Sequence, residues 1–586
     1  MEVTRLFDLL PYQLERNPKE DCLANKVNGK WVTYSTREVQ EYVNKVSLGL
    51  LKAGIKKDDK IAIISSNRPE WNFIDHGVQQ LGAILVPIYP TVTEEDFKFI
   101  FNDAEVKIVF VETAELHAKA KAAAAAVPSV KEIYSIFELP GVKNWKEIIQ
   151  AGEEGNVADL EPYKAAVTSE DTLTLIYTSG TTGTPKGVML THANLMSNYK
   201  ACIPLMPVNN THRALSFLPL CHVYERMMSY LYMAVGVSVY YAESMDTIAD
   251  NLKEVKPHMF TTVPRLLEKV YDRIVAKGGE LTGIKRALFF WALNLGLRYN
   301  IQGGNGFFYN IQLSLANKLI FSKWREALGN NIKAVVSGSA PLQPRLARVF
   351  WSARIPVMEG YGLTETSPVI SVNRCQPAEN RIGTVGPLIQ GVEVKIAEDG
   401  EILTRGPHIM KGYYKRPDLT EQAIDKEGWF HTGDIGEFVE GKYLKITDRK
   451  KEMFKTSGGK YIAPQLLENK FKESRFIEQM MVVGDGQKFP GALIVPAFDA
   501  LRKWCAIKNI HYTDDADMVK NKAVIDRIQK EVDEYNENFA QYEKIKKFVL
   551  MPRLWSIDEG ELTPTLKVKR KVINAKSKDL IEGMYQ

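Results

Sequence analysis

The chain has 586 residues, 45% hydrophobic and 25% charged, a composition typical of a globular protein too long for one core. Its 76 basic and 71 acidic residues leave a net charge of +5, which argues against a nucleic-acid-binding surface. Five cysteines without CxxC spacing, no signal-peptide pattern and no run of about 18 apolar residues argue against a disulfide framework, a zinc site and a membrane span. We therefore expect a cytoplasmic protein that is at most peripherally associated with membranes.

The first 170 residues alternate between helical and strand patterns. Apolar residues at helical spacing over 35–53 predict a helix, and the run Lys60–Ser65 predicts a short buried strand. This alternation predicts βαβ units and a mostly parallel sheet. Residues 150–170 are polar and acidic, and we expect them to form a connector. The other elements expected here are helices over 71–82, from 94 and over the alanine-rich stretch 118–126, and strands over 83–88 and 107–111.

The stretch Thr178–Gly187 (TSGTTGTPKG) lies between two apolar runs and consists almost entirely of hydroxyl-bearing residues and glycine. Such a loop can close its backbone N–H groups and hydroxyls around phosphate oxygens, with Lys186 supplying positive charge. A Walker A loop is excluded, because Gly187 rather than Ser or Thr follows the lysine. The remaining alternative is a surface linker, which rarely lies between two apolar runs.

Two stretches downstream have more than one interpretation. Leu218–Arg226 (LPLCHVYER) precedes an apolar helix through Val235, and a lone histidine at His222 also suits a packing role. Residues 275–330 interleave aromatic and aliphatic side chains with lysine and arginine. That pattern fits either an amphipathic surface that meets lipid or ordinary helices that cover a core.

Ala334–Leu342 (AVVSGSAPL) and Val357–Ser367 (VMEGYGLTETS) each predict a strand that ends in small residues. Parallel sheets bind ligands at the carboxyl ends of their strands. Small residues at Gly338–Ala340 leave room for a flat ring, on which Tyr361 can stack.

Glu365 lies just beyond the second of these strands. With the hydroxyls of Thr364 and Thr178, its carboxylate offers the hard oxygen ligands that Mg²⁺ on a triphosphate prefers. Taken alone, the sequence GYGLTE also fits a glycine-rich turn with a solvated glutamate.

Further candidates follow in Gly428–Asp434 (GWFHTGD) and Gly441–Lys451 (GKYLKITDRKK). The carboxylate of Asp434 suits the two hydroxyls of a ribose, and Arg449 can add a second hydrogen-bonding group. The alternative is an aspartate that closes a β-turn beside a solvated basic run.

The last 130 residues predict a compact α+β module. Lys455–Pro464 is a glycine-rich loop with flanking lysines, which suits contact with phosphate groups but is also common as a plain turn. Glu561–Lys571 contains Thr565-Leu566-Lys567. Taken alone, this stretch also fits a basic C-terminal tail. The regular elements expected here are helices from 465 and over 517–536, and strands over 480–483, 492–496 and 547–551.

From Thr178 to Lys567 these motifs stand in the order that they have in the adenylate-forming superfamily, and the sequence is identified as resembling its long-chain fatty acyl-CoA synthetases along essentially the whole chain. The resemblance implies a large N-terminal domain of two doubly wound α/β subdomains plus a distorted β-barrel, residues 1–450. It also implies a small mobile α+β C-terminal domain, residues 451–586, with Lys451 at the hinge. The family carries an invariant lysine at the position of Lys567, usually within a Ser-Gly-Lys triplet. This chain has Thr565-Leu566-Lys567 there, a variant that resembles the long-chain branch.

The resemblance implies an acid–thiol ligase that works in two half-reactions. A fatty carboxylate attacks the α-phosphate of ATP, with Mg²⁺ as cofactor, and gives acyl-adenylate and pyrophosphate. The thiol of coenzyme A, the co-substrate, then displaces AMP.

The same resemblance assigns roles to individual residues. Catalytic roles fall on Lys567, Glu365, Lys186 and His222, the last near the carboxylate, and metal binding falls on Thr178 and Glu365. Coenzyme A is expected at Lys455, Ser457, Gly458, Gly459 and Lys460. ATP and AMP are expected at Thr178, Ser179, Gly180, Thr181, Thr182, Gly183, Lys186, Gly338, Ser339, Ala340, Pro341, Glu359, Gly360, Tyr361, Gly362, Thr364, Asp434, Arg449 and Lys567.

Two rival functions stay open at this stage. The acceptor can be a carrier protein or the acid can be aromatic, although the apolar 275–330 region favours fatty acid and coenzyme A. The chain can also be a catalytically inactive, ATP-binding lipid sensor. However, an inactive homologue has no chemical need to keep Lys186, Glu365, Asp434 and Lys567 together. The sequence leaves open the acyl chain length, the pathway, membrane contact and the oligomeric state, a homodimer included.

Overall fold

The computed structural model describes residues 2–179, 185–557, 559–563 and 567–586. The chain folds into two compact units, which are taken separately below. The first comprises residues 1–395, 403–431 and 439–444, and the second comprises residues 396–402, 432–438 and 445–586.

A seven-stranded sheet in the first unit has the order β17-β8-β7-β4-β3-β5-β6. Its central strands are near-continuous apolar runs because both faces are buried, as the parallel pairing of β3 with β4 and β5 requires. Only β7–β8 and β8–β17 pair antiparallel. The strands are β3 (Lys60–Ile64), β4 (Ile84–Pro87), β5 (Val106–Val111), β6 (Glu132–Ser135), β7 (Thr172–Ser179), β8 (Pro185–Thr191) and β17 (Gly412–Tyr413).

An eight-stranded sheet in the same unit has the order β14-β13-β12-β11-β9-β10-β1-β2. The six strands from β13 to β1 pair parallel with one another, so their carboxyl ends share one edge, while β14 and β2 pair antiparallel at the two ends of the sheet. The strands are β1 (Leu23–Val27), β2 (Lys30–Tyr34), β9 (Arg213–Ser216), β10 (Ser238–Tyr241), β11 (Met259–Thr262), β12 (Ala334–Ser337), β13 (Val357–Gly362) and β14 (Val369–Val372).

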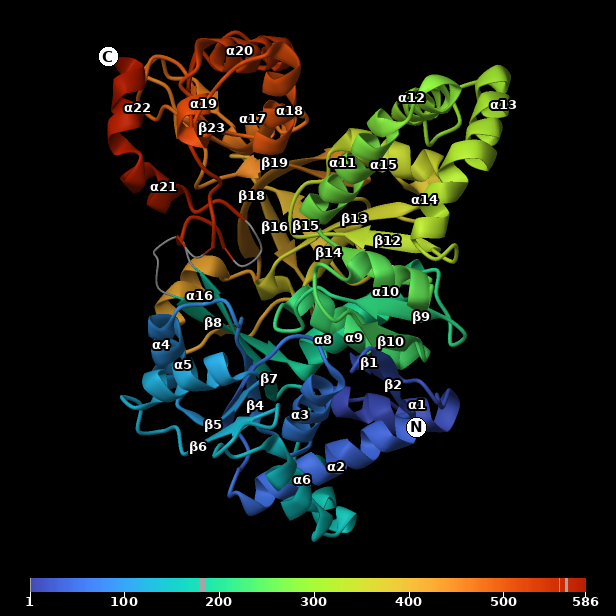
Figure 1. Ribbon diagram of the computed structural model, residues 1–586. Helices are drawn as coiled ribbons and strands as arrows, with labels where there is room; N and C mark the ends of the chain where they lie inside the picture. Colours follow the sequence, from blue (N-terminus) through green and yellow to red (C-terminus); the bar gives the residue numbers. More distant parts are fainter. Residues whose placement is uncertain (1, 180–184, 558, 564–566) are drawn as a thin grey trace. The chain divides into compact units, whose positions relative to one another are not determined.

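The helices of the first unit cover these sheets, and many begin at a side-chain cap that the sequence provides. Ser35 caps α2 reciprocally with Glu38, and Thr93 caps α4 with Asp96. Helices α2 and α6 lie against each other (Figure 1), and the crossing needs Gly49, where a Cβ would come within 2.0 Å of the Ile148 carbonyl oxygen. The α-helices are α1 (Leu9–Arg16), α2 (Thr36–Lys52), α3 (Pro69–Gln80), α4 (Glu94–Ala104), α5 (Ala114–Ala124), α6 (Trp145–Glu153), α7 (Glu161–Ala165), α8 (His192–Cys202), α9 (Val223–Val235), α10 (Ile248–Val255), α11 (Pro264–Glu280), α12 (Gly283–Leu297), α13 (Phe307–Ala316), α14 (Ser322–Ala327), α15 (Pro344–Ser352) and α16 (Pro417–Ala423).

The second unit has its own apolar core and its own sheets. A three-stranded sheet, β22 (Ile477–Val483), β23 (Gly491–Pro496) and β24 (Lys547–Leu550), packs with α17 (Pro464–Phe471) and α20 (Lys522–Asn536) around buried residues such as Leu493. A small hairpin is formed by β20 (Phe454–Lys455) and β21 (Tyr461–Ile462). The other helices are α18 (Phe498–Lys508), α19 (Asp515–Met518), α21 (Arg570–Lys576) and α22 (Lys578–Tyr585).

A four-stranded sheet of order β15-β16-β18-β19 contributes residues to both units. Its strands are β15 (Glu393–Ile396), β16 (Glu401–Arg405), β18 (Phe430–Val439) and β19 (Tyr443–Arg449). The expected fold class is confirmed, since the protein is mixed α/β with a large N-terminal domain and a smaller C-terminal one. Among the described residues, no helix is long and apolar enough to cross a membrane.

Candidate active site

The predicted phosphate loop connects two antiparallel strands. Strands β7 and β8 place Thr178 opposite Lys186 and Tyr177 opposite Gly187. The two flanking apolar runs therefore form a hairpin, unlike the strand-to-helix turn of a Walker A loop. The predicted ligands Gly180, Thr181, Thr182 and Gly183 lie outside the described residues, and Ser179 is described through its backbone alone.

Tyr413 connects the lysine of this hairpin to the predicted magnesium ligand. The ammonium nitrogen of Lys186 lies 5.1 Å from the centre of the Tyr413 ring. The Tyr413 hydroxyl donates a hydrogen bond of 2.9 Å to Glu365 Oε1. Burial, and then the neighbouring Glu365 carboxylate, raise the pKa of Tyr413 well above its usual range, so the phenol stays a donor. No sequence motif marks this residue.

Backbone hydrogen bonds around β17 fix this arrangement. The Tyr414 amide donates to the Gly187 carbonyl at 2.8 Å, and the Met410 amide donates to the Glu365 carbonyl at 2.9 Å. The short segment 410–414 therefore holds the phosphate hairpin and the Glu365 turn together through main-chain atoms, independently of any side chain.

Beyond β12, the stretch Gly338–Pro341 forms a turn that is held by a buried carboxyl. The Leu342 amide donates to Glu359 Oε1 at 2.8 Å, and Ser339 adopts a φ of +69°. Burial raises the pKa of Glu359 to about 8, so near neutral pH the group is largely protonated. Glu359 thus fixes the turn in which a flat ring was expected.

Gly362 is required where β13 runs into the Glu365 turn. A Cβ at this position would lie 1.8 Å from the Pro368 carbonyl oxygen, so only glycine fits. Gly360 and Tyr361 precede it on the half-buried end of β13, and Thr364 begins the short 3₁₀ turn that carries Glu365. The motif GYGLTE is therefore a strand end followed by a turn, as expected.

His222 caps the N-terminus of α9. Its Nδ1 accepts a hydrogen bond of 3.2 Å from the Tyr224 amide, so the neutral ring carries its proton on Nε2. Asn67 supports the preceding loop by accepting from the Leu220 amide at 2.9 Å and donating to the Leu218 carbonyl at 2.6 Å. His222 is thus a half-buried capping residue whose Nε2–H is a potential donor.

One turn further along α9, a buried charge network joins this helix to the phosphate hairpin. Arg226 forms an ion pair of 2.5 Å with Asp75, and both side chains have 0% exposure. Arg226 also donates to the Thr174 hydroxyl at 2.7 Å on β7 and to the Tyr230 hydroxyl at 2.9 Å. The helix that begins at His222 and the strand that leads to Thr178 are therefore connected in the core.

In the second unit, Asp434 and Arg449 come together from β18 and β19. Arg449 Nε lies 3.2 Å from Asp434 Oδ1, with 6% of the Asp434 side chain exposed and 42% of the Arg449 side chain. The Asp434 amide donates to the Thr432 hydroxyl at 3.1 Å, which orients the strand. The two residues that were expected to meet one ribose therefore lie side by side.

The hinge candidate Lys451 lies in an exposed turn after β19. The next residue, Glu452, pairs with Arg570 Nε at 3.0 Å, and Arg570 also pairs with the buried Glu468 of α17. Arg570 was not singled out in the sequence. It anchors the start of this segment to the region just beyond Lys567.

Lys567 is exposed and belongs to no helix or strand. Leu562 and Val568 form a β-bridge, the Thr563 amide donates to the Lys567 carbonyl at 2.8 Å, and the Lys567 amide donates to the Thr563 hydroxyl at 3.0 Å. Thr565 and Leu566 lie outside the described residues. The backbone at Lys567 is therefore fixed by its hydrogen bonds to Thr563.

The predicted coenzyme A loop is the tip of the β20–β21 hairpin. The Thr456 amide donates to the Lys460 carbonyl at 2.9 Å, and Gly459 takes a φ of +80° that favours glycine. Ser457, Gly458 and Lys460 are exposed. The ammonium of Lys455 lies 5.3 Å from the centre of the Tyr461 ring, so cationic and aromatic groups share this tip.

The residues predicted for Mg²⁺ fit a cation that is held mainly by a nucleotide. Among the described residues, no group of three or more His, Cys, Asp and Glu side chains could hold a metal ion. Mg²⁺ at nucleotide sites commonly uses one or two carboxylates and completes its shell with phosphate oxygens and water. The Glu365 carboxylate, with the hydroxyls of Thr364 and Thr178 as further oxygens, suits that mode.

Comparison with known families gives two matches along the chain. Residues 10–414 match the family described as AMP-binding enzyme, and residues 452–586 match the AMP-binding enzyme C-terminal domain. A long-chain-fatty-acid–CoA ligase of Mycobacterium tuberculosis, FadD15, is 34% identical over 581 residues, covering 98% of this chain and 96% of that protein. Human long-chain-fatty-acid–CoA ligase 1 is 31% identical, covering 100% of this chain and 87% of its own length.

Solved structures share the fold at lower sequence identity. The A-PCP didomain of a carboxylic acid reductase from Segniliparus rugosus in complex with AMP has a TM-score of 0.75 and 22% identity, covering 100% of this chain and 82% of that chain. A fatty acyl CoA synthetase from Mycobacterium tuberculosis has a TM-score of 0.64 and 21% identity, covering 98% of this chain and 99% of that chain.

Proposed function

Because this chain belongs to the AMP-binding enzyme family, we propose that it is a long-chain fatty acid–CoA ligase and that the residues described above carry its reaction. The proposed reaction activates a fatty acid with ATP to acyl-adenylate and pyrophosphate, and then transfers the acyl group to coenzyme A. The similarity to curated ligases along almost the whole chain supports this activity.

The observation that carries the proposal is the Lys186–Tyr413–Glu365 arrangement. A carboxylate is a poor acyl donor, since its leaving group would be oxide, and adenylation supplies a good leaving group. The protein must therefore hold two anions in line and neutralise the charge that develops on the phosphates. Tyr413 sets a lysine and a carboxylate at a fixed spacing, which suits a triphosphate and its cation.

We assign the rest of the nucleotide to two groups of residues. The Gly338–Pro341 turn and the strand end with Tyr361 suit an adenine ring, and the Asp434–Arg449 pair suits the ribose hydroxyls. We assign Mg²⁺ to the Glu365 carboxylate, with the hydroxyls of Thr178 and Thr364 as further oxygen ligands. The ion would act as a Lewis acid and neutralise charge on the phosphate oxygens.

In the first half-reaction a carboxylate oxygen bonds to the α-phosphorus and pyrophosphate leaves. We propose that the Lys567 ammonium contacts the carboxylate and the α-phosphate, and that His222 Nε2–H donates near the carboxylate. Both groups would stabilise negative charge without themselves forming a covalent bond.

In the second half-reaction the coenzyme A sulfur bonds to the acyl carbon and AMP leaves. We assign the coenzyme to the hairpin tip at 455–460, whose lysines suit its phosphates. The proposal divides the chain at 450/451, with Lys451 as the hinge, and gives the C-terminal domain one working position for each half-reaction. The cysteine pattern suits the reducing environment of the cytoplasm.

The first test is pyrophosphate release with MgATP and a panel of acids from acetate to oleate, plus benzoate, with and without coenzyme A. Release that peaks with long chains, and acyl-CoA that forms only when the thiol is present, is the expected result. Release without thioester would point to another acceptor, such as a carrier protein. ATP binding without release for any acid would overturn the ligase proposal and leave a lipid sensor.

A further inference from the structure

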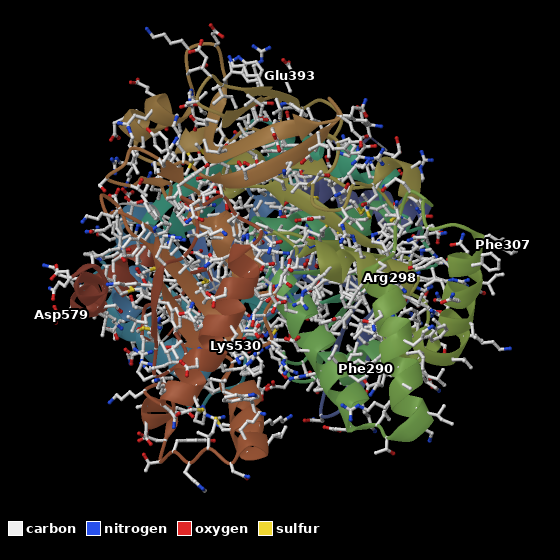
Figure 2. The ribbon with its side chains drawn as sticks, turned by 90° about the horizontal axis from the view of Figure 1, so that it is seen from above. Phe290, Arg298, Phe307, Glu393, Lys530 and Asp579 are labelled. Carbon is white, nitrogen blue, oxygen red and sulfur yellow. The ribbon has the colours of Figure 1, made fainter. Side chains whose placement is uncertain are left out.

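Helix α13 and the π-helical turn that continues it expose an apolar face. Phe307 and Phe308 are among the most exposed apolar residues of the first unit, and Figure 2 shows the Phe307 side chain directed away from the ribbon of its helix. We call these five residues the α13 face; their exposures are Phe307 74%, Phe308 79%, Ile311 52%, Leu315 49% and Leu319 45%.

The α13 face is one continuous stripe along the helix. Its members recur at intervals of three and four residues, so they lie on one side. The opposite side meets the protein: Tyr309 donates to the Leu295 carbonyl of α12 at 2.6 Å, and Ala316 is fully buried. The core is therefore complete without the exposed stripe, which makes the stripe a candidate interaction surface.

The charge of the surrounding segment limits the choice of partner. Residues 281–325 contain six lysines and arginines and no aspartate or glutamate, in a chain whose total charges almost balance. Arg325 is used internally, since it donates to Asn317 Oδ1 and the Ala353 carbonyl. The other five basic residues are Lys285, Arg286, Arg298, Lys318 and Lys323, all exposed, with Lys323 also paired to Glu326.

We propose that the α13 face docks on the surface of a bilayer that contains anionic lipid, with the helix lying along the interface. Phenylalanine and leucine on one side and basic residues beside them are typical of interfacial helices. The helical stretch 307–321 is roughly 22 Å long at 1.5 Å per residue, enough to lie along the headgroup boundary. This inference concerns binding and stands whether or not the ligase proposal holds.

A second copy of the chain fits this face less well. A two-fold dimer through the α13 face would bring Lys318 of each copy into one interface, and the carboxylate that follows this segment, Glu326, is already paired with Lys323. An anionic membrane offers both the apolar phase and the opposite charge.

The test is co-flotation of the full-length protein with vesicles of phosphatidylcholine alone and with about one-third phosphatidylglycerol, which supplies the anionic surface. The wild type should float with the anionic vesicles. The double variant Phe307→Ser with Phe308→Ser should lose about tenfold or more of its vesicle partition, because two large apolar side chains no longer enter the interface. Equal partition of this variant and the wild type would overturn the proposal.

A control replaces two other exposed apolar residues that lie outside the α13 face. Met245 and Ile507 have exposures of 58% and 77%, and Met245→Ser with Ile507→Ser should float like the wild type. Failure of the wild type to float with any vesicle would also overturn the proposal. A shift in oligomeric state for the Phe307/Phe308 variant in the absence of vesicles, without a change in flotation, would assign the face to a second copy.

Two further arms separate charge from apolar contact. Lys318→Gln with Lys323→Gln should weaken flotation with anionic vesicles and reduce its dependence on salt. The chain has nine tryptophans, so Phe308→Trp is compared with the wild type by difference. The difference spectrum should show blue-shifted emission on vesicles and quenching by brominated lipid, and a solvent-like difference spectrum on bound vesicles would contradict insertion of this face. The thermal unfolding midpoint should be the same in all these variants, so a folding defect is recognisable.

Discussion

Two variants of Tyr413 distinguish the role of its hydroxyl from the role of its ring. Tyr413→Phe removes the donor to Glu365 and keeps the ring beside Lys186. We expect a loss of about ten- to a hundredfold in adenylation, the size of one hydrogen bond to a charged group, with the optimum shifted to higher Mg²⁺ concentration. Tyr413→Leu should lose more, since Lys186 then lacks the ring as well. ATP–pyrophosphate exchange measured against Mg²⁺ reports both effects.

The neighbouring Tyr414 is the control for that experiment. Its ring faces Lys60 and Lys415 rather than Lys186, so Tyr414→Phe should leave the exchange reaction unchanged. If Tyr413→Phe behaved like this control at every Mg²⁺ concentration, Tyr413 would have no role in setting the lysine–carboxylate spacing.

Glu359 predicts a dependence of stability on pH. Burial raises its pKa from 4.5 in the unfolded chain to about 8. Between these values the folded protein binds one more proton, so this group's contribution to stability is complete below pH 4.5 and is lost as the pH rises to about 8. Glu359→Gln, which mimics the protonated acid, should remove that loss and flatten the thermal midpoint over this range.

The measurement is the difference in thermal midpoint between Glu359→Gln and the wild type from pH 5 to 9. Subtraction cancels the other raised carboxyls, such as Glu225, whose pKa burial raises to about 7. Glu41→Gln, at an exposed position on α2, is the control and should give a flat difference. A difference for Glu359→Gln that does not change with pH would contradict the raised pKa.

At the scale of single residues, the sequence located side chains with a motif of their own and missed those defined by long-range contact. Glu365 and Lys186 stand in composition patterns that suit phosphate and magnesium. Tyr413 has no such pattern, because its role depends on β17 pairing with β8, which lies far away in the chain. The roles proposed for His222 and Lys567 stay predictions.

At the scale of elements, the Arg226–Asp75 pair predicts coupling between α9 and β7. Arg226→Met leaves a buried carboxylate without its partner, which should cost about 3–5 kcal/mol of unfolding free energy. The double variant Arg226→Met with Asp75→Leu should cost less than the sum of the single variants, since no unpaired charge remains. Urea unfolding followed by tryptophan fluorescence measures all three variants.

An exposed ion pair provides the comparison for that cycle. Lys45 and Glu153 lie 2.8 Å apart with 35% and 52% of their side chains exposed, and replacing either should cost below about 1 kcal/mol. Additive costs for Arg226 and Asp75 would show that the buried pair does not act as one unit.

Element prediction succeeded where periodicity was strong and local. The helix expected over 35–53 is α2, and the strand expected over 60–65 is β3. The helix expected over 517–536 is divided into α19 and α20, because Asn521 caps the second helix through its side chain. The polar connector over 150–170 contains a 3₁₀ turn and α7, short elements whose few apolar residues leave a weak pattern.

At the scale of the whole molecule, the proposed division of labour predicts that the two half-reactions can be separated. Lys567→Ala should lose adenylation and still convert supplied acyl-adenylate and coenzyme A to acyl-CoA, because the lysine is assigned to the first step alone. Single-turnover assays of each half-reaction measure this. Equal loss of both steps would contradict the assignment.

The order of strands in the seven-stranded sheet has a consequence for synthesis on the ribosome. Strand β8 lies between β7, which precedes it directly, and β17, which follows more than two hundred residues later at Gly412–Tyr413. Until that segment emerges, one edge of β8 has no partner, and unpaired strand edges are sites of wrong association. A nascent chain stalled before Gly412 should therefore depend on chaperones, and release of that dependence should coincide with the arrival of Tyr413.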